Sequence, residues 1–126
     1  MPAADWVQKI RSSDASPFYQ DVWMAMLQIP RGKVSTYGDI ARLIRRPRAV
    51  RAVGGACNQN PFAPNVPCHR IVSSNGALGG YAHGSAAKIA LLKKEGISCE
   101  KGKIVHFSRV RHVFSRSALS LFKDRE

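Results

Sequence analysis

The fold is decided by residues 36–57, which read TYGDIARLIRRPRAVRAVGGAC. Thr36, with Asp39 three residues later, resembles a capping box and predicts a helix that runs through Ile44. Pro47 is well placed as the first residue of a second helix. Two short helices joined by a tight turn predict a helix-turn-helix.

The second helix, which should run to about Cys57, has one basic and one apolar face at the helical period. The basic face carries Arg48, Arg51, Gly55 and Asn58, and the apolar face carries Val50, Val53 and Cys57. Gly54 and Gly55 each weaken a helix by about 1 kcal/mol relative to Ala, a cost that suits a surface approached closely by another body. A DNA groove is the partner we expect, and a crossing helix is the alternative.

The rest of the chain predicts short elements around this unit. A helix begins at Pro17 and stops before Pro30, residues 68–73 are strand-like, and Ser85 caps a helix that ends at Gly96. Residues 97–105 predict a hairpin, which beside a helix-turn-helix would be a wing. We therefore expect a mainly α fold with small β elements, a single winged helix-turn-helix domain over residues 17–108. Residues 1–16 would form an N-terminal arm and residues 109–126 a basic C-terminal tail.

Charge points to the partner class. Twenty Lys and Arg residues against eight Asp and Glu give a formal net charge of +12, which is typical of proteins that bind polyanions. Three cysteines without a CxxC motif favour reduced thiols and no metal site. Without an apolar leader or a long apolar run, we expect a protein inside the cell, cytoplasmic in a prokaryote or nuclear in a eukaryote, with no membrane partner. We also expect a monomer.

The tetrapeptide Pro67-Cys68-His69-Arg70 carries a candidate nucleophile beside a candidate base. A cysteine is mostly protonated at neutral pH, so a reactive one needs a base or a positive field. Adjacent side chains on an extended strand point to opposite faces, so His69 would act on Cys68 through a bridging water. Glu95 is the candidate carboxylate that orients the imidazole. The alternative is that Cys68 is buried and inert.

At this point a family resemblance becomes specific. The chain resembles the C-terminal, alkyl-accepting domain of the O6-alkylguanine-DNA alkyltransferases from about Phe18 to Gly96. The matching pieces are Gly32-Lys33-Val34-Ser35-Thr36-Tyr37, Arg51-Ala52-Val53-Gly54-Gly55-Ala56, Asn60-Pro61, Pro67-Cys68-His69-Arg70-Ile71-Val72, Gly80-Tyr81, and Lys88 through Leu91-Leu92 to Glu95-Gly96.

The resemblance implies a protein that binds the minor groove, flips O6-alkylguanine out of duplex DNA and moves the alkyl group irreversibly to Cys68. It needs no cofactor and no metal. His69, a water and Glu95 would deprotonate Cys68. The other residues that the resemblance assigns are Asn60 as a brace of the active-site hinge, Tyr37 as a contact of the target nucleotide and hydrogen-bond donor to the leaving guanine, Arg51 as the finger that replaces the flipped base, and Cys57, Ile71, Tyr81 and Ala82 as the pocket lining. We also expect Arg48, Ala52 and Gly54 to contact DNA.

The chain also departs from the family pattern. The larger N-terminal domain common in the family has no counterpart in these residues. Cys57 stands where a larger apolar side chain is usual, and His83 replaces a common glycine, so both could alter which O6 substituents fit. Two alternative functions follow: an alkyltransferase-like protein, which binds the lesion without accepting the alkyl group, and a winged-helix regulator in which Cys68 is inert. Because Cys68 is present, we rank the alkyltransferase-like protein below alkyl transfer.

Overall fold

The computed structural model describes residues 3–122, with side chains from Asp5 onward. Predictions for residues 1–2 of the arm and 123–126 of the tail lie outside the described residues. The elements in chain order are α1 (Ala3–Arg11), α2 (Pro17–Met26), β1 (Ser35–Thr36), α3 (Tyr37–Leu43), α4 (Val50–Asn58), the 3₁₀ turn η1 (Cys68–Arg70), β2 (Ile71–Val72), α5 (Ser85–Lys94), β3 (Cys99–Glu100), β4 (Lys103–Ile104), α6 (Phe107–Val110) and α7 (Arg116–Leu119). No helix within residues 3–122 has the length and apolar character needed to cross a membrane.

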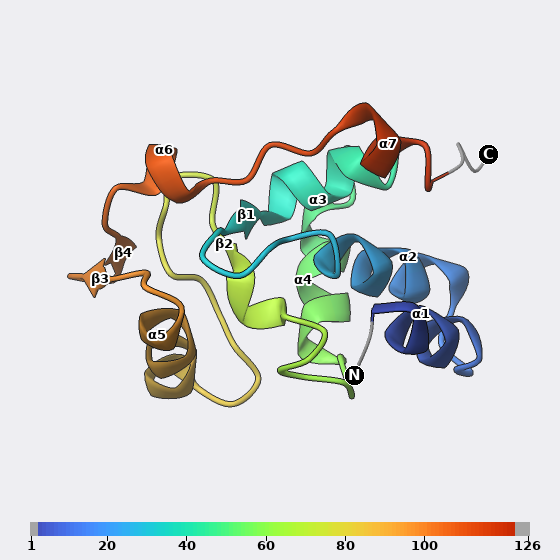
Figure 1. Cartoon of the computed structure of the whole chain (residues 1–126), viewed down its shortest axis with the longest axis horizontal. Coiled ribbons are helices and arrows are strands. Elements are labelled where there is room, and N and C mark those ends of the chain that lie inside the picture. Colours follow the sequence, from blue (N-terminus) through green and yellow to red (C-terminus); the bar gives the residue numbers. More distant parts are fainter. Residues whose placement is uncertain (1–2, 123–126) are drawn as a thin grey trace.

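The helices α1 to α4 gather at one end of the molecule, and α5 with the β3–β4 hairpin lies at the other (Figure 1). This arrangement confirms the predicted fold class, mainly α with small β elements and a hairpin wing. The turn η1 lies between the two ends and contacts both α2 and α5. The segment that carries Cys68 is therefore held from both sides.

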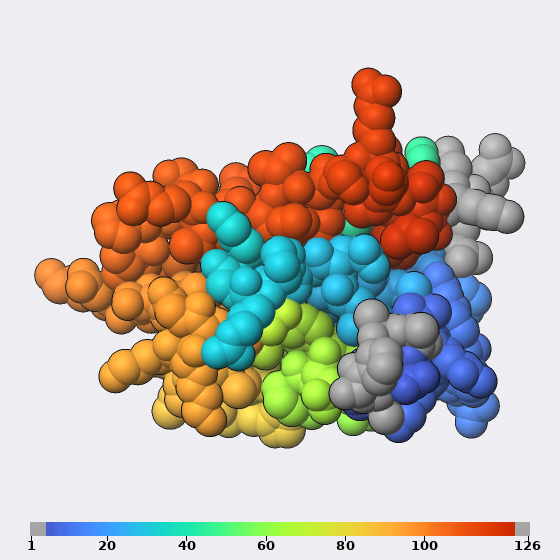
Figure 2. Space-filling view, viewed as in Figure 1, coloured from blue at the N-terminus to red at the C-terminus, as the bar shows by residue number. Residues whose placement is uncertain are grey.

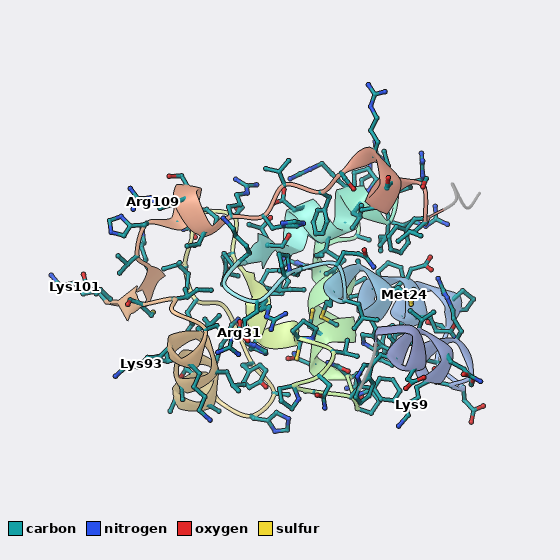
Figure 3. All side chains as sticks on the ribbon, in the orientation of Figure 1. Lys9, Met24, Arg31, Lys93, Lys101 and Arg109 are labelled. Atoms are coloured by element: carbon teal, nitrogen blue, oxygen red, sulfur yellow. The ribbon has the colours of Figure 1, made fainter. Side chains whose placement is uncertain are left out.

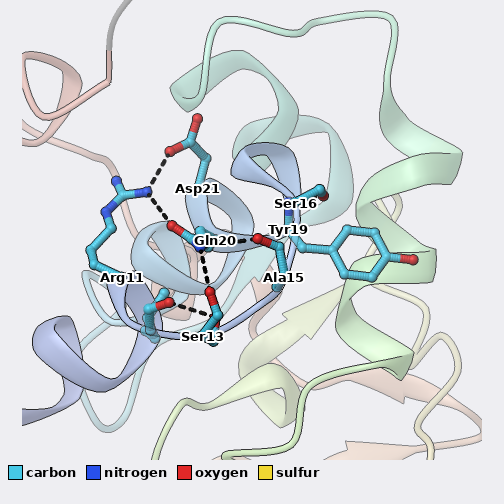
Figure 4. A network of polar contacts seen from close by, with 8 residues as sticks. Arg11, Ser13, Ala15, Ser16, Tyr19, Gln20 and Asp21 are labelled. Carbon is cyan, nitrogen blue, oxygen red and sulfur yellow. Dashed lines mark hydrogen bonds and ion pairs between the residues drawn. The ribbon is translucent and has the colours of Figure 1, made fainter.

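Polar contacts fasten α1 to α2 (Figure 4). Arg11 pairs with the buried Asp21 at 3.1 Å. The Gln20 side-chain amide donates to the carbonyl oxygens of Ser13 and Ala15, at 3.2 and 3.0 Å. Gln20 on α2 thereby binds two backbone carbonyls of the loop that joins the helices, and α1 packs against α2. Whether residues 1–16 form a separate arm stays a prediction.

The helix-turn-helix differs from the prediction in its turn. Thr36 caps α3 as expected, because its side chain accepts a hydrogen bond from the Asp39 amide at 3.0 Å. The prediction that Pro47 begins the second helix is wrong: α4 begins at Val50. Pro47 instead occupies a turn that is closed by the Ala49 amide donating to the Arg46 carbonyl at 2.9 Å. Its fixed φ suits the second position of a turn as well as the first turn of a helix.

The active-site segment is a turn followed by a strand. Residues 68–73 were expected to be strand-like throughout, but Cys68–Arg70 forms η1, and only Ile71–Val72 is a strand. β2 pairs in parallel with β1, with Ser35 opposite Ile71 and Thr36 opposite Val72. The start of α3 and the end of η1 are thus joined by one short ladder.

The helix α5 ends as predicted and begins differently. Gly96 lies at φ +82, and the Ile97 amide returns to the Leu92 carbonyl at 2.9 Å, which is a Schellman end. Ser85 was expected to cap the helix, but it is the first helical residue and Gly84 precedes it without a side-chain cap. β3 and β4 then pair antiparallel, as the predicted hairpin requires.

Two apolar clusters make up the core. The larger one joins α2, α3 and α4, where the indole of Trp23 also donates to the Ala56 carbonyl at 2.9 Å. The smaller one lies under α5 and the hairpin and comprises Val34, Val72, Leu78, Leu92, Ile97 and Ile104. Val34 directly precedes β1 and Val72 is the second residue of β2, so the short ladder lies where the smaller cluster meets the rest of the domain.

The C-terminal segment runs along α3 (Figure 1) and forms a continuous band across the top of the molecule (Figure 2). Arg111 grips Asp39 through two hydrogen bonds of 2.9 Å, and Arg45 donates to the Phe122 carbonyl at 2.7 Å. Phe122 itself is 2% exposed. This segment contains one short helix, α7, with Ala118 buried. The separation of a tail at residue 109 stays a prediction.

Candidate active site

Cys68 is a buried thiol on a turn. It begins η1 and is 5% exposed. Burial raises the pKa of Cys68 above its ordinary value, while a hydrogen bond from Asn60 and the charge of Lys88 act to lower it. The thiol is therefore mostly protonated at neutral pH, and its use as a nucleophile requires a nearby base.

His69 supplies such a base. Its Nε2 lies 3.0 Å from Oε2 of Glu95. Burial works against ionisation of Glu95, but the hydrogen bonds from Arg70 and His69 outweigh it and hold the Glu95 pKa below its usual range. An ionised carboxylate only accepts hydrogen bonds, so Nε2 of His69 carries the proton and Nδ1 is the basic nitrogen. Burial lowers the pKa of His69 against the opposing effect of Glu95, which keeps the imidazole neutral.

Nδ1 of His69 is free to accept a proton. It is buried and has no hydrogen-bond partner among the described residues. The turn at Cys68–Arg70 replaces the expected strand, so the argument from alternating strand faces does not apply to Cys68 and His69. Since Nε2 is hydrogen-bonded to Glu95 and Nδ1 has no partner in the described part of the chain, Cys68 and His69 share no direct hydrogen bond. Transfer of a proton between them would go through a water.

From the start of α3, Tyr37 faces the loop of residues 75–84, which holds four glycines and is called the Gly-rich loop below. Its hydroxyl donates to the Gly80 carbonyl at 3.5 Å. A Cβ atom on Gly79, which lies at φ +74, would come within 2.9 Å of the Tyr37 hydroxyl oxygen, so this approach requires glycine. Burial, followed by the charge of Cys57, raises the pKa of Tyr37 to about 12. The phenol therefore stays a proton donor at neutral pH.

The four residues predicted to line the pocket differ in burial. Cys57 and Ile71 are buried, Tyr81 is half-buried and Ala82 is exposed. Burial, and after it the charge of Cys68, raises the pKa of Cys57 to about 12 and also raises the pKa of Tyr81. Both side chains thus lie within electrostatic reach of the sulfur of Cys68. The Cys57 thiol therefore stays protonated at neutral pH.

Three of the residues predicted to contact DNA, Arg51, Ala52 and Gly54, lie in α4, and their role stays a prediction. Arg51 and Ala52 are exposed in the first turn, and a Cβ on Gly54 would reach only ordinary contact with the Tyr37 ring at 4.0 Å. Arg48 lies in the turn before α4 rather than on its face, because the helix starts at Val50. Val50 was expected on the apolar face but is 42% exposed, since the first turn projects beyond the core.

Asn60 braces the loop that leads from α4 to η1. Its side-chain amide donates to the Val66 carbonyl at 2.7 Å, and its side-chain oxygen accepts from the Phe62 amide at 2.9 Å. A third contact, to the sulfur of Cys68, lowers the pKa of that thiol. One side chain thus fixes the path of the loop and contacts the nucleophile at its end.

Sequence reasoning gave no role to two cations near Cys68. Arg70 grips Glu95 through two hydrogen bonds of 2.8 Å and also donates to the Ile29 carbonyl at 2.8 Å. Lys88 is fully buried in α5. The signal for Lys88 was its position four residues before the buried Leu92, which puts both on one helix face. Within the described residues, no three His, Cys, Asp or Glu side chains gather as metal ligands would.

Comparisons with known proteins agree with this geometry. Residues 17–97 match the family model described as 6-O-methylguanine DNA methyltransferase, DNA binding domain. The chain is 51% identical over 86 residues to the methylated-DNA–protein-cysteine methyltransferase of Methanosarcina acetivorans, which covers 68% of this chain and 54% of the relative. It is 46% identical over 85 residues to the enzyme of the same name from Salmonella typhimurium, covering 68% and 50%. The chain thus spans about half the length of these curated relatives.

Two solved structures extend the comparison. Mycobacterium tuberculosis OGT in complex with DNA matches with a TM-score of 0.64 and 48% identity, over 65% of this chain and 50% of that one. S. pombe Atl1, in complex with damaged DNA containing O6-carboxymethylguanine, matches with a TM-score of 0.70 and 30% identity, over 80% of this chain and 99% of that one. Since the family model also matches more than half of the chain, the protein belongs to the family of the 6-O-methylguanine DNA methyltransferase DNA-binding domain.

Proposed function

We propose that this chain is a DNA repair protein that takes the alkyl group of O6-alkylguanine in duplex DNA and holds it irreversibly on Cys68. In this proposal it corresponds to the C-terminal, alkyl-accepting domain of the family and acts as a monomer. The observation that carries the proposal is a row of side chains beside Cys68. Nδ1 of His69 is buried without a hydrogen-bond partner among the described residues, Nε2 of His69 is hydrogen-bonded to Glu95, and Arg70 donates to the same carboxylate.

The chemistry balances without a cofactor. A water passes the Cys68 proton to Nδ1 of His69, and the thiolate attacks the alkyl carbon on O6. The new sulfur–carbon bond forms as the carbon–O6 bond breaks, and the electron pair stays on the guanine. The Tyr37 hydroxyl donates a hydrogen bond to that developing anion, which its high pKa allows. A thioether is a poor leaving group, so each protein molecule accepts one alkyl group.

DNA is the partner in this proposal. The net charge of +12 suits a polyanion, and the related OGT and Atl1 structures are described as complexes with DNA. Extruding a base from the duplex costs a few kcal/mol, which a residue filling the gap can offset. Arg51, exposed on the first turn of α4, is the residue we assign to that gap.

One observation favours a second function, the binding of the lesion without transfer. Atl1 matches this chain over 99% of its own length and with a TM-score of 0.70. The Cys68, His69 and Glu95 arrangement favours transfer, since a protein that only binds has no need of a base beside a thiol.

The decisive experiment uses a duplex with one O6-methylguanine and fragment-ion mass spectrometry of the protein. We expect one methyl group on Cys68, while Cys57 and Cys99 serve as internal controls and stay unmodified. Selective binding of the damaged duplex without a thioether would instead support the lesion-binding function. Equal binding of damaged and undamaged duplex without a thioether would support a winged-helix regulator.

A further inference from the structure

Lys88 is the largest fully buried side chain of the described residues, and the proposed reaction assigns it no role. It lies on the inner face of α5, with 0% of the residue exposed. Burying an ammonium group is costly unless hydrogen bonds and nearby negative charge compensate. A long apolar side chain would fill the same space without that cost, so packing alone does not explain a lysine here.

The contacts of Lys88 join two walls of the candidate active site. Its Nζ donates to the Ile71 carbonyl at 2.6 Å and to the Gly80 carbonyl at 3.0 Å. Ile71 directly follows η1, and Gly80 directly precedes the half-buried Tyr81. Tyr37 donates to the same Gly80 carbonyl from α3. One ammonium group therefore fixes the Gly-rich loop against the strand that follows Cys68.

The charge of Lys88 also acts on the thiol. The titratable groups that face it are Cys57 on α4, Cys68 and His69 on η1, and Cys99 on β3. Burial lowers the pKa of Lys88 to about 8, so it is still mostly charged at neutral pH. That charge lowers the pKa of Cys68 and disfavours protonation of His69. Both effects favour a thiolate beside a neutral base.

We infer that Lys88 is a positioning residue that holds the Gly80 segment against the active-site strand and supplies the positive charge that favours the Cys68 thiolate. Its part in alkyl transfer rests on the proposed function. Its effect on the thiol does not, because the reactivity of Cys68 toward a small alkylating reagent can be measured without DNA.

The test compares Lys88→Met, which keeps the length but removes the charge, with Lys93→Met, an exposed lysine on the same helix (Figure 3). The rate of Cys68 alkylation by iodoacetamide is followed by mass spectrometry from about pH 6 to pH 10. Below about pH 8, Lys88→Met should react about three to ten times more slowly than wild type. Above that pH the wild-type lysine loses its charge, so the two rates should converge. Lys93→Met should follow wild type throughout.

A constant ratio of rates at every pH, or no difference, would overturn the electrostatic part of the inference, since a purely structural role has no reason to vanish near pH 8. If Lys88→Met does not fold, the wild-type protein decides: the Cε signal of Lys88 should titrate near pH 8 in a carbon NMR experiment. A midpoint at the ordinary lysine value of about 10.4 would count against it.

The reaction with free O6-benzylguanine tests the loop. Lys88→Met should lose about tenfold or more in rate, beyond the loss measured with iodoacetamide, because the freed loop no longer shapes the pocket. Equal losses with both reagents would reject that part. If wild type accepts no alkyl group from DNA but shows the pH-dependent iodoacetamide ratio, the proposed function fails and the thiol-activating role stands. If wild type accepts an alkyl group from DNA but the ratio of iodoacetamide rates is the same at every pH, the proposed function stands and the thiol-activating role fails.

Discussion

The cations near Cys68 have hydrogen-bond partners within the fold, whereas those on and just before the outer face of α4 have none among the described residues. Near Cys68, Lys88 and Arg70 are bound on several sides by carbonyl and carboxylate oxygens. On and just before α4, Arg51 and Arg48 are exposed, and their side chains make no hydrogen bond or ion pair with the described part of the chain. A cation whose partners lie within the fold stabilises the structure around Cys68 and affects the reactivity of its thiol. A cation without them is available to a phosphate or a base, so changes in the two regions should alter different measurements.

The largest effect should come from Cys68→Ser. Alkyl transfer should fall more than about a thousandfold, because a serine hydroxyl is a far weaker nucleophile than a thiolate. Affinity for damaged duplex should stay within about twofold, because the free cations lie on α4 rather than η1. Single-turnover transfer assays and binding titrations check both values. Cys99→Ser, at a half-buried thiol on the hairpin, is the matched control and should transfer normally. Loss of binding in Cys68→Ser would break the division between the two regions.

Glu95→Gln should slow transfer by about ten- to a hundredfold and move the pH dependence of thiol alkylation upward. The neutral amide no longer stabilises a protonated His69, so the base is weaker. The Glu95 pKa lies below its ordinary value of 4.5, so the stabilising contribution of the carboxylate is present above that pH and is lost as the pH falls through the lowered pKa. Thermal unfolding at several pH values measures this. A variant with lower stability but the wild-type rate and pH profile per folded molecule would show that Glu95 is only structural.

Arg51→Ala should slow repair of damaged duplex by about tenfold while leaving the reaction with free O6-benzylguanine unchanged. Its role in the proposal is to fill the gap left by the flipped base, and a free base leaves no gap. Parallel rate measurements on the two substrates test this. Equal losses on both would place Arg51 with the residues that support Cys68, and the contrast between the two regions would no longer hold.

The smallest effect should come from Arg48→Ala. As a phosphate contact in the turn before α4, it should weaken binding to damaged and undamaged duplex alike and reduce the slope of log affinity against log salt by about one. Binding titrations at several salt concentrations provide the slope. A loss confined to the damaged duplex would contradict a phosphate contact.

Local signals predicted the start of α3, the end of α5 and the hairpin, since a cap, a C-terminal glycine and a Gly-centred turn act within a few residues. The start of α4 was wrong because Pro47 fits a helix start and a turn equally well, and hydrogen bonds within the turn decide between them. Cys68, His69 and Glu95 were predicted from what a reactive thiol requires, and most of the other site residues came from the family resemblance. Lys88 was given no role because lysine is rarely buried, and only the fold brings two backbone carbonyls to its Nζ.

The pairing of β1 with β2 sets where the chain tolerates a change in length. Thr36 and Val72 are opposite one another, Tyr37 follows the first strand, and Cys68 lies one turn before the second. An inserted residue between Thr36 and Tyr37, or between Arg70 and Ile71, would shift Tyr37 relative to Cys68 by up to about 3.3 Å, the rise of one residue along a strand. Insertions at the exposed hairpin tip, residues 101–102, lie outside this spacing. Tags and fusion partners therefore belong at the tip, where an added loop costs little stability.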